Sequence, residues 1–211
     1  MKFENAVISL VLGAIIALPL LEAVLRKTLH VGISNSASMV QHLTLVVGML
    51  GAAVAARENR LLALSSLGQL LQGKWQKFAA IAGGACSVGV SVLLAAAGTD
   101  FVLAEMTSGQ TLAYGLPVWV VQTVMPVCFG GIALRLVGHV AASWKAGGAV
   151  VLLAGAWILL WNWSPMSSLV IVGLAALSGA PAFASLAGVA LVLFKHAGEP
   201  IASIPIAHYS L

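Results

Sequence analysis

Charged residues are scarce in this sequence. Only 8% of its 211 residues are Asp, Glu, Lys or Arg, whereas 61% are hydrophobic, and the mean hydropathy is +1.05. A soluble domain carries roughly 25% charged residues. Ten Lys+Arg and six Asp+Glu are too few to cover a water-facing surface. The scarcity therefore excludes a soluble globular domain and predicts a chain built from membrane-spanning helices.

Catalytic and metal-binding motifs are also missing. The sequence contains no GxSxG, no Walker A loop and no HExxH. Its two cysteines, Cys86 and Cys128, fall inside apolar stretches and form no CxxC or Cys/His spacing. We interpret them as small buried apolar side chains. We therefore expect no enzyme activity, no catalytic residue, no metal site and no cofactor in this chain.

Long apolar stretches nearly fill the chain. A transmembrane helix needs about 20 mostly apolar residues, so the pattern predicts an all-α polytopic membrane protein. The third stretch contains Gly83, Gly84 and Gly89, which allow close approach of a neighbouring helix. The sixth is too long for one straight span, and Gly179-Ala180-Pro181 predicts a break within it. The expected spans are approximately 6–25, 38–56, 78–97, 116–137, 147–161 and 166–194.

The first stretch also has some features of a secretory signal peptide, because Lys2 precedes its apolar run. The run is long for a signal peptide, however, and Glu4 is unusual in the basic region. Ala23 offers only a weak cleavage site. We interpret the stretch as an uncleaved first span.

The segment between the second and third spans has a different pattern. Apolar side chains recur at steps of three and four, and polar side chains take the other faces. This pattern predicts an amphipathic helix in the plane of the membrane interface. Packing against a partner is a compatible alternative. The residues that define this interfacial helix are Leu64, Leu67, Leu71, Lys74 and Trp75.

The basic residues indicate an orientation. With the N-terminus inside, eight Lys and Arg residues face the cytoplasm and only Arg26 and Lys27 face outward. The positive-inside rule therefore predicts a cytoplasmic N-terminus. The predicted loop 98–115, with Asp100 and Glu105 but no basic residue, then faces the exterior. We attribute the net charge of +4 to this topology rather than to nucleic-acid binding.

Ionisable residues inside spans are functional candidates by default. Glu22 can pair with Arg26, one turn later on the same helix face. We interpret His42 as a shallow, hydrogen-bonded interfacial histidine. None of the first five spans carries a charged residue at mid-depth. A chain without a polar site at the midplane suits a scaffold or accessory subunit better than a carrier.

Several of these features together resemble the small membrane (Q) subunit of tripartite ATP-independent periplasmic (TRAP) transporters. The resemblance covers about residues 6–145. It departs from the family pattern at 36–42, where the family often has acidic residues, and at Asn59-Arg60, where the family usually has a His. Each matching residue alone also fits an ordinary interfacial or helix-end position. The residues that carry the resemblance are Arg26, Arg57, Glu58, Arg60, Pro117, Trp119, Pro126, Gly130 and Arg135.

The remainder of the chain resembles the start of the large (M) subunit of the same transporters, in which a helix is broken as at Gly179 and Pro181. We therefore expect a four-span Q-type domain at 1–145 and a joining transmembrane helix at 146–165. The segment 166–211 is then a truncated M-type domain. A gene split, a frameshift or deliberate design would each explain the truncation.

The resemblance implies a non-catalytic scaffold subunit of a sodium-coupled transporter in the bacterial inner membrane. The imported substrate would be an organic anion, such as a dicarboxylate or a sialic acid. Expected partners are an M subunit or the rest of a fused chain, a periplasmic binding protein and the lipid bilayer. Sodium coupling is expected in M. The alternatives are an unrelated assembly factor, a membrane enzyme, or a stand-alone channel or carrier.

Overall fold

The computed structural model describes residues 2–33, 35–58, 60–61, 73–140, 144–160 and 165–198. Within these ranges the chain is helical apart from its connections, and one isolated bridge joins Thr111 to Pro117. The all-α prediction is confirmed. The helices are α1 (Lys2–Thr28), α2 (Ser36–Arg57), α4 (Lys74–Ser108), the short 3-10 helix η1 (Ala113–Gly115), α5 (Val118–Gln122), α6 (Val124–Val140), α7 (Trp144–Leu160), α8 (Pro165–Leu177) and α9 (Ala182–His196).

Four helical segments are long and apolar enough to cross a membrane. They are Glu4–Thr28, Ser36–Arg57, Trp75–Ser108 and Val118–His139, the last of which comprises α5 and α6. These segments confirm the first four predicted spans. The helices α7, α8 and α9 are apolar but shorter. At 1.5 Å per residue, the 13 residues of α8 extend only about 20 Å, less than the roughly 30 Å of a hydrocarbon core.

The predicted break in the sixth apolar stretch is confirmed. Helix α8 ends at Leu177, and Gly179 follows with φ +100°, a conformation that residues with a Cβ rarely adopt. Pro181 then stands at the N-cap of α9, where its missing N–H costs nothing. A glycine and a proline therefore stop one helix and start the next within four residues.

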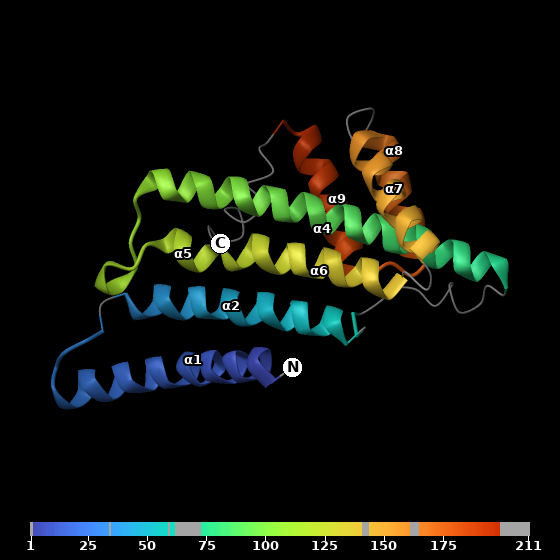
Figure 1. Ribbon diagram of the computed structural model, residues 1–211. Coiled ribbons are helices and arrows are strands. Elements are labelled where there is room, and N and C mark those ends of the chain that lie inside the picture. Colours follow the sequence, from blue (N-terminus) through green and yellow to red (C-terminus); the bar gives the residue numbers. More distant parts are fainter. Residues whose placement is uncertain are drawn as a thin grey trace.

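The predicted loop from Gly98 is wrong, because α4 continues as a helix to Ser108. Gly98 permits a close contact: a Cβ there would lie 3.3 Å from Cδ of Pro126. The helix ends instead at Gly109, whose φ of +67° places it in the left-handed region. With 35 residues, α4 is about 52 Å long. Its first turns project beyond the ends of α2 and α6 (Figure 1).

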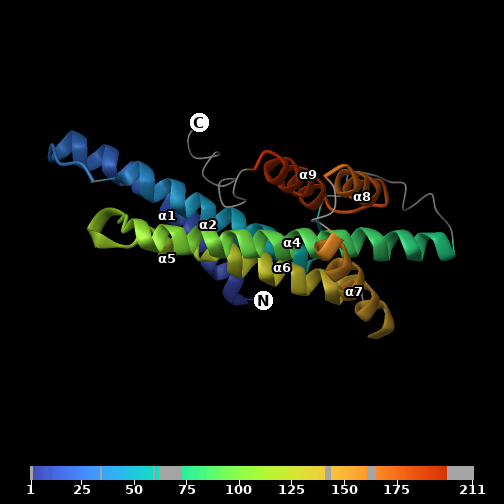
Figure 2. The same cartoon turned by 90° about the horizontal axis from the view of Figure 1, so that it is seen from above.

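The four spans form a row one helix thick. Helix α1 packs mainly on α2, α2 on α6, and α6 on α4 (Figures 1 and 2). The buried share of each span rises along the row, from 6% for α1 through 17% for α2 and 33% for α5–α6 to 56% for α4. The packed core therefore lies at the α4 end, and α1 forms the exposed edge.

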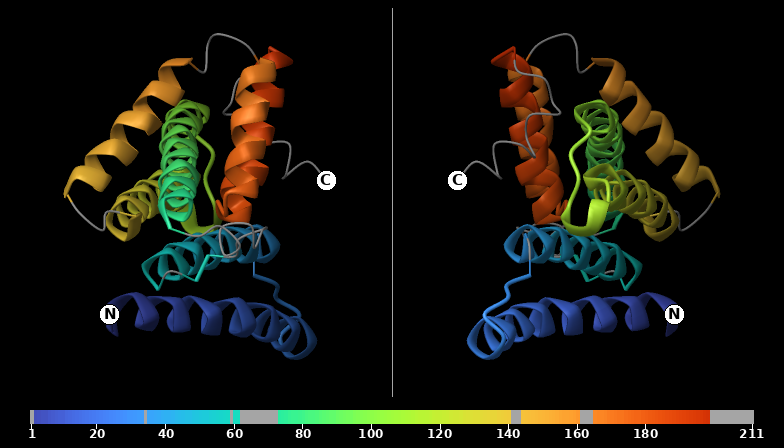
Figure 3. Two further views of the ribbon diagram at one scale, coloured as in Figure 1. Left: turned by 90° about the vertical axis from the view of Figure 1, so that its right-hand side faces the viewer. Right: turned by 90° about the vertical axis from the view of Figure 1, so that its left-hand side faces the viewer.

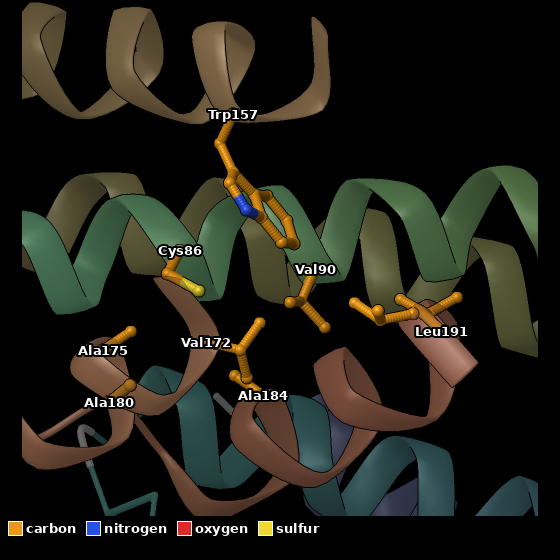
Figure 4. Close-up of a cluster of buried hydrophobic side chains, with 9 residues drawn as sticks. Cys86, Val90, Trp157, Val172, Ala175, Ala180, Ala184 and Leu191 are labelled. Carbon is orange, nitrogen blue, oxygen red and sulfur yellow. The ribbon is translucent and has the colours of Figure 1, made fainter. Parts of the chain in front are cut away.

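Helix α4 is the centre of that core. Helix α7 packs on one side of it, and α8 with α9 on the other (Figure 3). Trp157 of α7 lies over Gly89, where an added Cβ would be 2.6 Å from Cε3 of the indole. On the opposite side from Trp157, Val90 lies in one buried cluster with Val172, Ala184 and Leu191 (Figure 4). The prediction that glycines of the third stretch allow close approach is confirmed at Gly89.

Candidate functional site at the ends of three helices

The terminal turns of three helices meet at one end of the row. Helix α1 begins there, and α2 and α6 end there. The Glu4 carboxylate bridges two arginines at this point. Its Oε2 lies 2.6 Å from Nη1 of Arg57, and its Oε1 lies 2.6 Å from Nη2 of Arg135. All three side chains are partly buried, with exposed fractions between 21% and 31%. Each carboxylate oxygen thus contacts an arginine of a different helix, Oε2 that of α2 and Oε1 that of α6.

The topology explains why these residues meet. Helices α1 and α2 are consecutive and antiparallel, so the first turn of α1 lies beside the last turn of α2. Glu4 is the acidic residue of the first turn of α1, and Arg57 is the basic residue of the last turn of α2. Both positions suit the helix dipole. Arg135 reaches the same point from near the end of α6.

Side chains of α6 also bond backbone carbonyls in the last turns of α2. The Nη1 group of Arg135 donates a hydrogen bond to the carbonyl oxygen of Ala53, at 2.5 Å. The Nε2 atom of His139 lies 3.1 Å from the carbonyl oxygen of Arg57 and, protonated there, donates to it. The carbonyl of Arg57 is the last of α2 and lacks an intrahelical donor, which a basic side chain commonly supplies, whereas the carbonyl of Ala53 lies one turn earlier and accepts Arg135 as an additional donor. Arg135 therefore joins α1, α2 and α6 through one guanidinium group.

The charged cluster becomes weaker towards its edge. Glu58 contacts Arg57 at 3.3 Å and Arg60 at 3.8 Å. Arg60 is 80% exposed, and such surface pairs contribute little to stability. The sequence placed Arg57, Glu58 and Arg60 in one basic turn, and the structure adds Glu4 and Arg135 to them.

Glu4, Arg57 and Arg135 form a structural link between three helices, which we call the brace. Both oxygens of Glu4 accept charge-assisted hydrogen bonds, and arginine stays protonated, so neither group is available for proton transfer. The cluster contains no nucleophile. Within the described ranges, no group of three or more His, Cys, Asp or Glu side chains is placed to hold a metal ion.

A second polar contact fastens the other end of α1. Glu22 Oε1 lies 2.6 Å from Nη2 of Arg26, which confirms the predicted pair one turn apart. The hydroxyl of Ser36, at the start of α2, donates to the other oxygen of Glu22. Helix α1 is therefore joined to its neighbours by a glutamate near each end, with a largely exposed apolar stretch between them.

Of the residues that carry the family resemblance, Pro117, Trp119, Pro126 and Gly130 lie in or next to α5 and α6. Pro117 is the N-cap of α5, and Trp119 follows in its first turn as a partly exposed residue. Pro126 packs against Gly98, as described above. A Cβ at Gly130 would meet nothing within 4 Å, so no contact in this chain requires a glycine there.

The interfacial helix was predicted partly wrongly. Leu64, Leu67 and Leu71 lie outside the described residues. Lys74 and Trp75 instead form the first turn of α4 and continue without a break into the third span. Gly73, with φ +65°, is the N-cap residue of α4. The three-four spacing of apolar residues continues through a helix start, so spacing alone did not mark the boundary.

His42 and Glu4 show opposite outcomes of the sequence interpretation. His42 is buried, and its Nδ1 lies 2.8 Å from the carbonyl oxygen of Ser38, as expected of a hydrogen-bonded histidine. Glu4 was noted only as an unusual acid near a basic N-terminus. One sequence signal could have linked Glu4 to this cluster: its predicted position on the same side of the membrane as Arg57 and Arg135.

Comparison with known proteins adds one match. A family model described as the DctQ component of tripartite ATP-independent periplasmic transporters matches residues 15–146, more than half of the chain. Arg57 and Arg135 lie inside the matched range. Comparisons with curated proteins and with solved structures find no match. The matching family consists of transporter components rather than enzymes.

Proposed function

The chain belongs to the DctQ family of tripartite ATP-independent periplasmic transporter components, and from this premise we propose that it is the non-catalytic scaffold subunit of such a transporter. Its four spans and its family make it a multi-pass membrane protein. One observation carries the scaffold proposal. In the described parts of the four spans, charged side chains lie towards the helix ends, and those of the brace are paired.

The burial pattern favours a scaffold over a subunit that contains the transport path. A carrier needs polar groups at the membrane midplane to bind its substrate. The buried serines Ser87 and Ser91 of α4 donate their hydroxyls to carbonyls one turn earlier in their own helix. Their hydroxyl donors are therefore used within α4. A row of helices braced at its ends suits a rigid support on which a transporting subunit moves.

We further propose the partners and the setting. The transport path and the sodium coupling would belong to an M subunit or to the rest of a fused chain. Import of an organic anion would also require a soluble periplasmic binding protein. The excess of basic residues on one side supports a cytoplasmic N-terminus in a bacterial inner membrane.

The proposed domain division has the same basis. A family match that ends at residue 146 agrees with a Q-type domain at 1–145 followed by a joining helix at 146–165. The broken pair α8 and α9 would open an M-type domain at 166–211. This pair packs on α4, which supports α4 as the helix on which M-type segments dock.

Reconstitution tests the scaffold proposal directly. The full chain is placed in liposomes alone, and in parallel with its M subunit and soluble binding protein, and sodium-driven uptake of labelled dicarboxylate and sialic acid is measured. We expect a stable complex with M, and uptake of one of these anions only with all components present. Uptake by the chain alone would show that it is a carrier. Failure to assemble with M would refute the subunit assignment.

A further inference from the structure

Asp100 lies within the apolar layer of the membrane, although the sequence places it in a predicted loop. Helix α4 continues through this position and ends at Ser108. The neighbouring span, Val118–His139, has 22 residues and is about 33 Å long, close to the roughly 30 Å of a hydrocarbon core. Val118 therefore lies close to one boundary of that core.

The contact between α4 and α6 gives the depth of Asp100. Pro126 is eight residues beyond Val118, about 12 Å into the core, and it packs against Gly98 of α4. The two helices run in opposite directions (Figure 1), so Asp100, two residues after Gly98, lies about 9 Å inside the boundary. Asp100 is only eight residues before the end of α4, but this helix is long enough to extend past the boundary.

The carboxylate of Asp100 has no partner in the part of the chain that the structure describes. The residue is exposed, and the nearest basic residue of α4 is Lys77, 23 residues earlier. A charged side chain within the hydrocarbon layer is costly, and such residues almost always pair with another group or face the interior of a helix bundle. Aspartate is also short and, unlike lysine or arginine, does not extend to the headgroups. The carboxylate therefore requires a donor that the described residues do not supply.

Helix α4 changes from fully covered to partly uncovered along its length. Residues 83–91 are all buried, because α6, α7, α8 and α9 pack around this part of the helix. From Val92 onwards one side is uncovered, and α7 and α8 lie beside only the first half of α4 (Figure 1). The uncovered residues recur at steps of three and four, so they share one side of the helix. This open face comprises Val92, Ala96, Asp100 and Leu103.

The open face continues a surface on which another helix already packs. Gly89 lies three residues before Val92 on the same side of α4, and Trp157 of α7 covers it. Val92 and Leu103 are 42% and 55% exposed, so uncovered apolar side chains flank the Asp100 carboxylate along the helix. Two copies of this chain packed by this face about a two-fold axis would bring two carboxylates together. The face therefore fits a different chain that offers an apolar helix with one positive charge.

We propose that a transmembrane helix of the M subunit packs on the open face and places a Lys or Arg side chain against Asp100. The apolar residues of the face provide the packing contact, and the carboxylate accepts charge-assisted hydrogen bonds from the ammonium or guanidinium group. Sliding of one helix along the other would leave both charges unpaired in lipid, so the pair fixes their register. This inference rests on the proposed function, because it requires an M subunit as partner, and it adds the site and the chemistry of the contact.

The test measures the Kd between the labelled full chain and its M subunit in detergent micelles by microscale thermophoresis. Asp100→Asn keeps the shape of the side chain and removes its charge. We expect the Kd to rise about tenfold or more, because the basic residue of M is then left unpaired. Glu105→Gln is the matched control, because it makes the same change about 140° around α4 from Asp100, at a carboxylate bonded to Ser108. Its Kd should equal that of wild type.

Two further measurements identify the occupant. The isolated Asp100→Asn chain should unfold at the same temperature as wild type or higher, and a lower midpoint would show that the carboxylate is used within the chain and overturn the proposal. A photoreactive p-benzoyl-phenylalanine in place of Leu103 should cross-link to an M segment that contains Lys or Arg. A cross-link to a second copy of the chain, or to lipid alone, would also overturn it.

The outcomes separate this contact from the scaffold proposal. If the wild-type chain does not bind M, the scaffold proposal is refuted and the contact with it. If the wild-type chain binds M and Asp100→Asn binds equally well, the contact is refuted and the scaffold proposal stands.

Discussion

Glu4 and Arg135 are 131 residues apart in the chain, yet their Oε1 and Nη2 atoms lie 2.6 Å apart. The contact connects the first turn of α1 to α6, a helix that is not its main packing neighbour in the row. In a bilayer, helices gain little from the hydrophobic effect when they associate, so polar contacts and close packing determine their positions. The edge helix α1, buried over only 6% of its span, depends on such contacts most.

Removing the charge of Glu4 should loosen α1. Glu4→Gln can keep one hydrogen bond but no longer offers a charged oxygen to both arginines. We expect a loss of about 1–3 kcal/mol, measured as a lower midpoint of thermal unfolding in detergent. Glu105→Gln is the matched control, because the Glu105 carboxylate accepts a local bond from Ser108 and, among the described residues, no bond from another helix. Equal midpoints for the two variants would show that the brace does not stabilise the chain.

Arg135 should not tolerate lysine. Its guanidinium donates from two nitrogens, to Ala53 and to Glu4, and the single ammonium of lysine does not reproduce that fork. We expect Arg135→Lys to lower stability by about 1–2 kcal/mol, whereas Arg60→Lys, at an 80% exposed position, should have no measurable effect. If Arg135→Lys has the same unfolding midpoint as wild type, a positive charge alone is sufficient at this position and the fork is not required.

Gly89 and Gly130 should respond in opposite ways to alanine. A methyl group at Gly89 would overlap the Trp157 indole, so Gly89→Ala should cost about 1–3 kcal/mol. Gly130→Ala meets nothing and should be neutral or stabilise α6 by up to about 1 kcal/mol. Chemical denaturation in micelles measures both. The double variant Gly89→Ala/Trp157→Leu should recover part of the loss, and no recovery would contradict the proposed clash.

Replacing Gln122 with an apolar residue should stabilise the chain. It is 6% exposed, and its Oε1 has no hydrogen-bond partner in the part of the chain that the structure describes. Pro126, four residues later, also has no N–H to offer the Gln122 carbonyl. We expect Gln122→Met to stabilise the chain by about 1 kcal/mol, seen as a higher unfolding midpoint. Gln76→Met, at an exposed position, is the control, and a destabilised Gln122→Met would show that the amide is satisfied.

Local signals located the spans because the bilayer imposes a local requirement. Each crossing segment must satisfy its own backbone hydrogen bonds, so an apolar stretch of sufficient length becomes a helix whatever its neighbours are. Other local rules predicted the break at Gly179 and Pro181, from helix-breaking residues, and the pair of Glu22 with Arg26, from their spacing of one helical turn. Gly98 was misinterpreted because a glycine can end a helix or admit a neighbour, and only the position of Pro126 distinguishes these roles.

The sequence by itself determined that this chain is a helical membrane protein, where most of its helices lie, and, through the fourth-span residues, which family it resembles. Only the tertiary structure decided the order α1, α2, α6, α4 across the row, the bridge from Glu4 to two arginines, and the depth at which Asp100 lies. The physical reason is that hydropathy sets whether a helix forms in lipid, whereas lateral order depends on side chains far apart in sequence that fit one another.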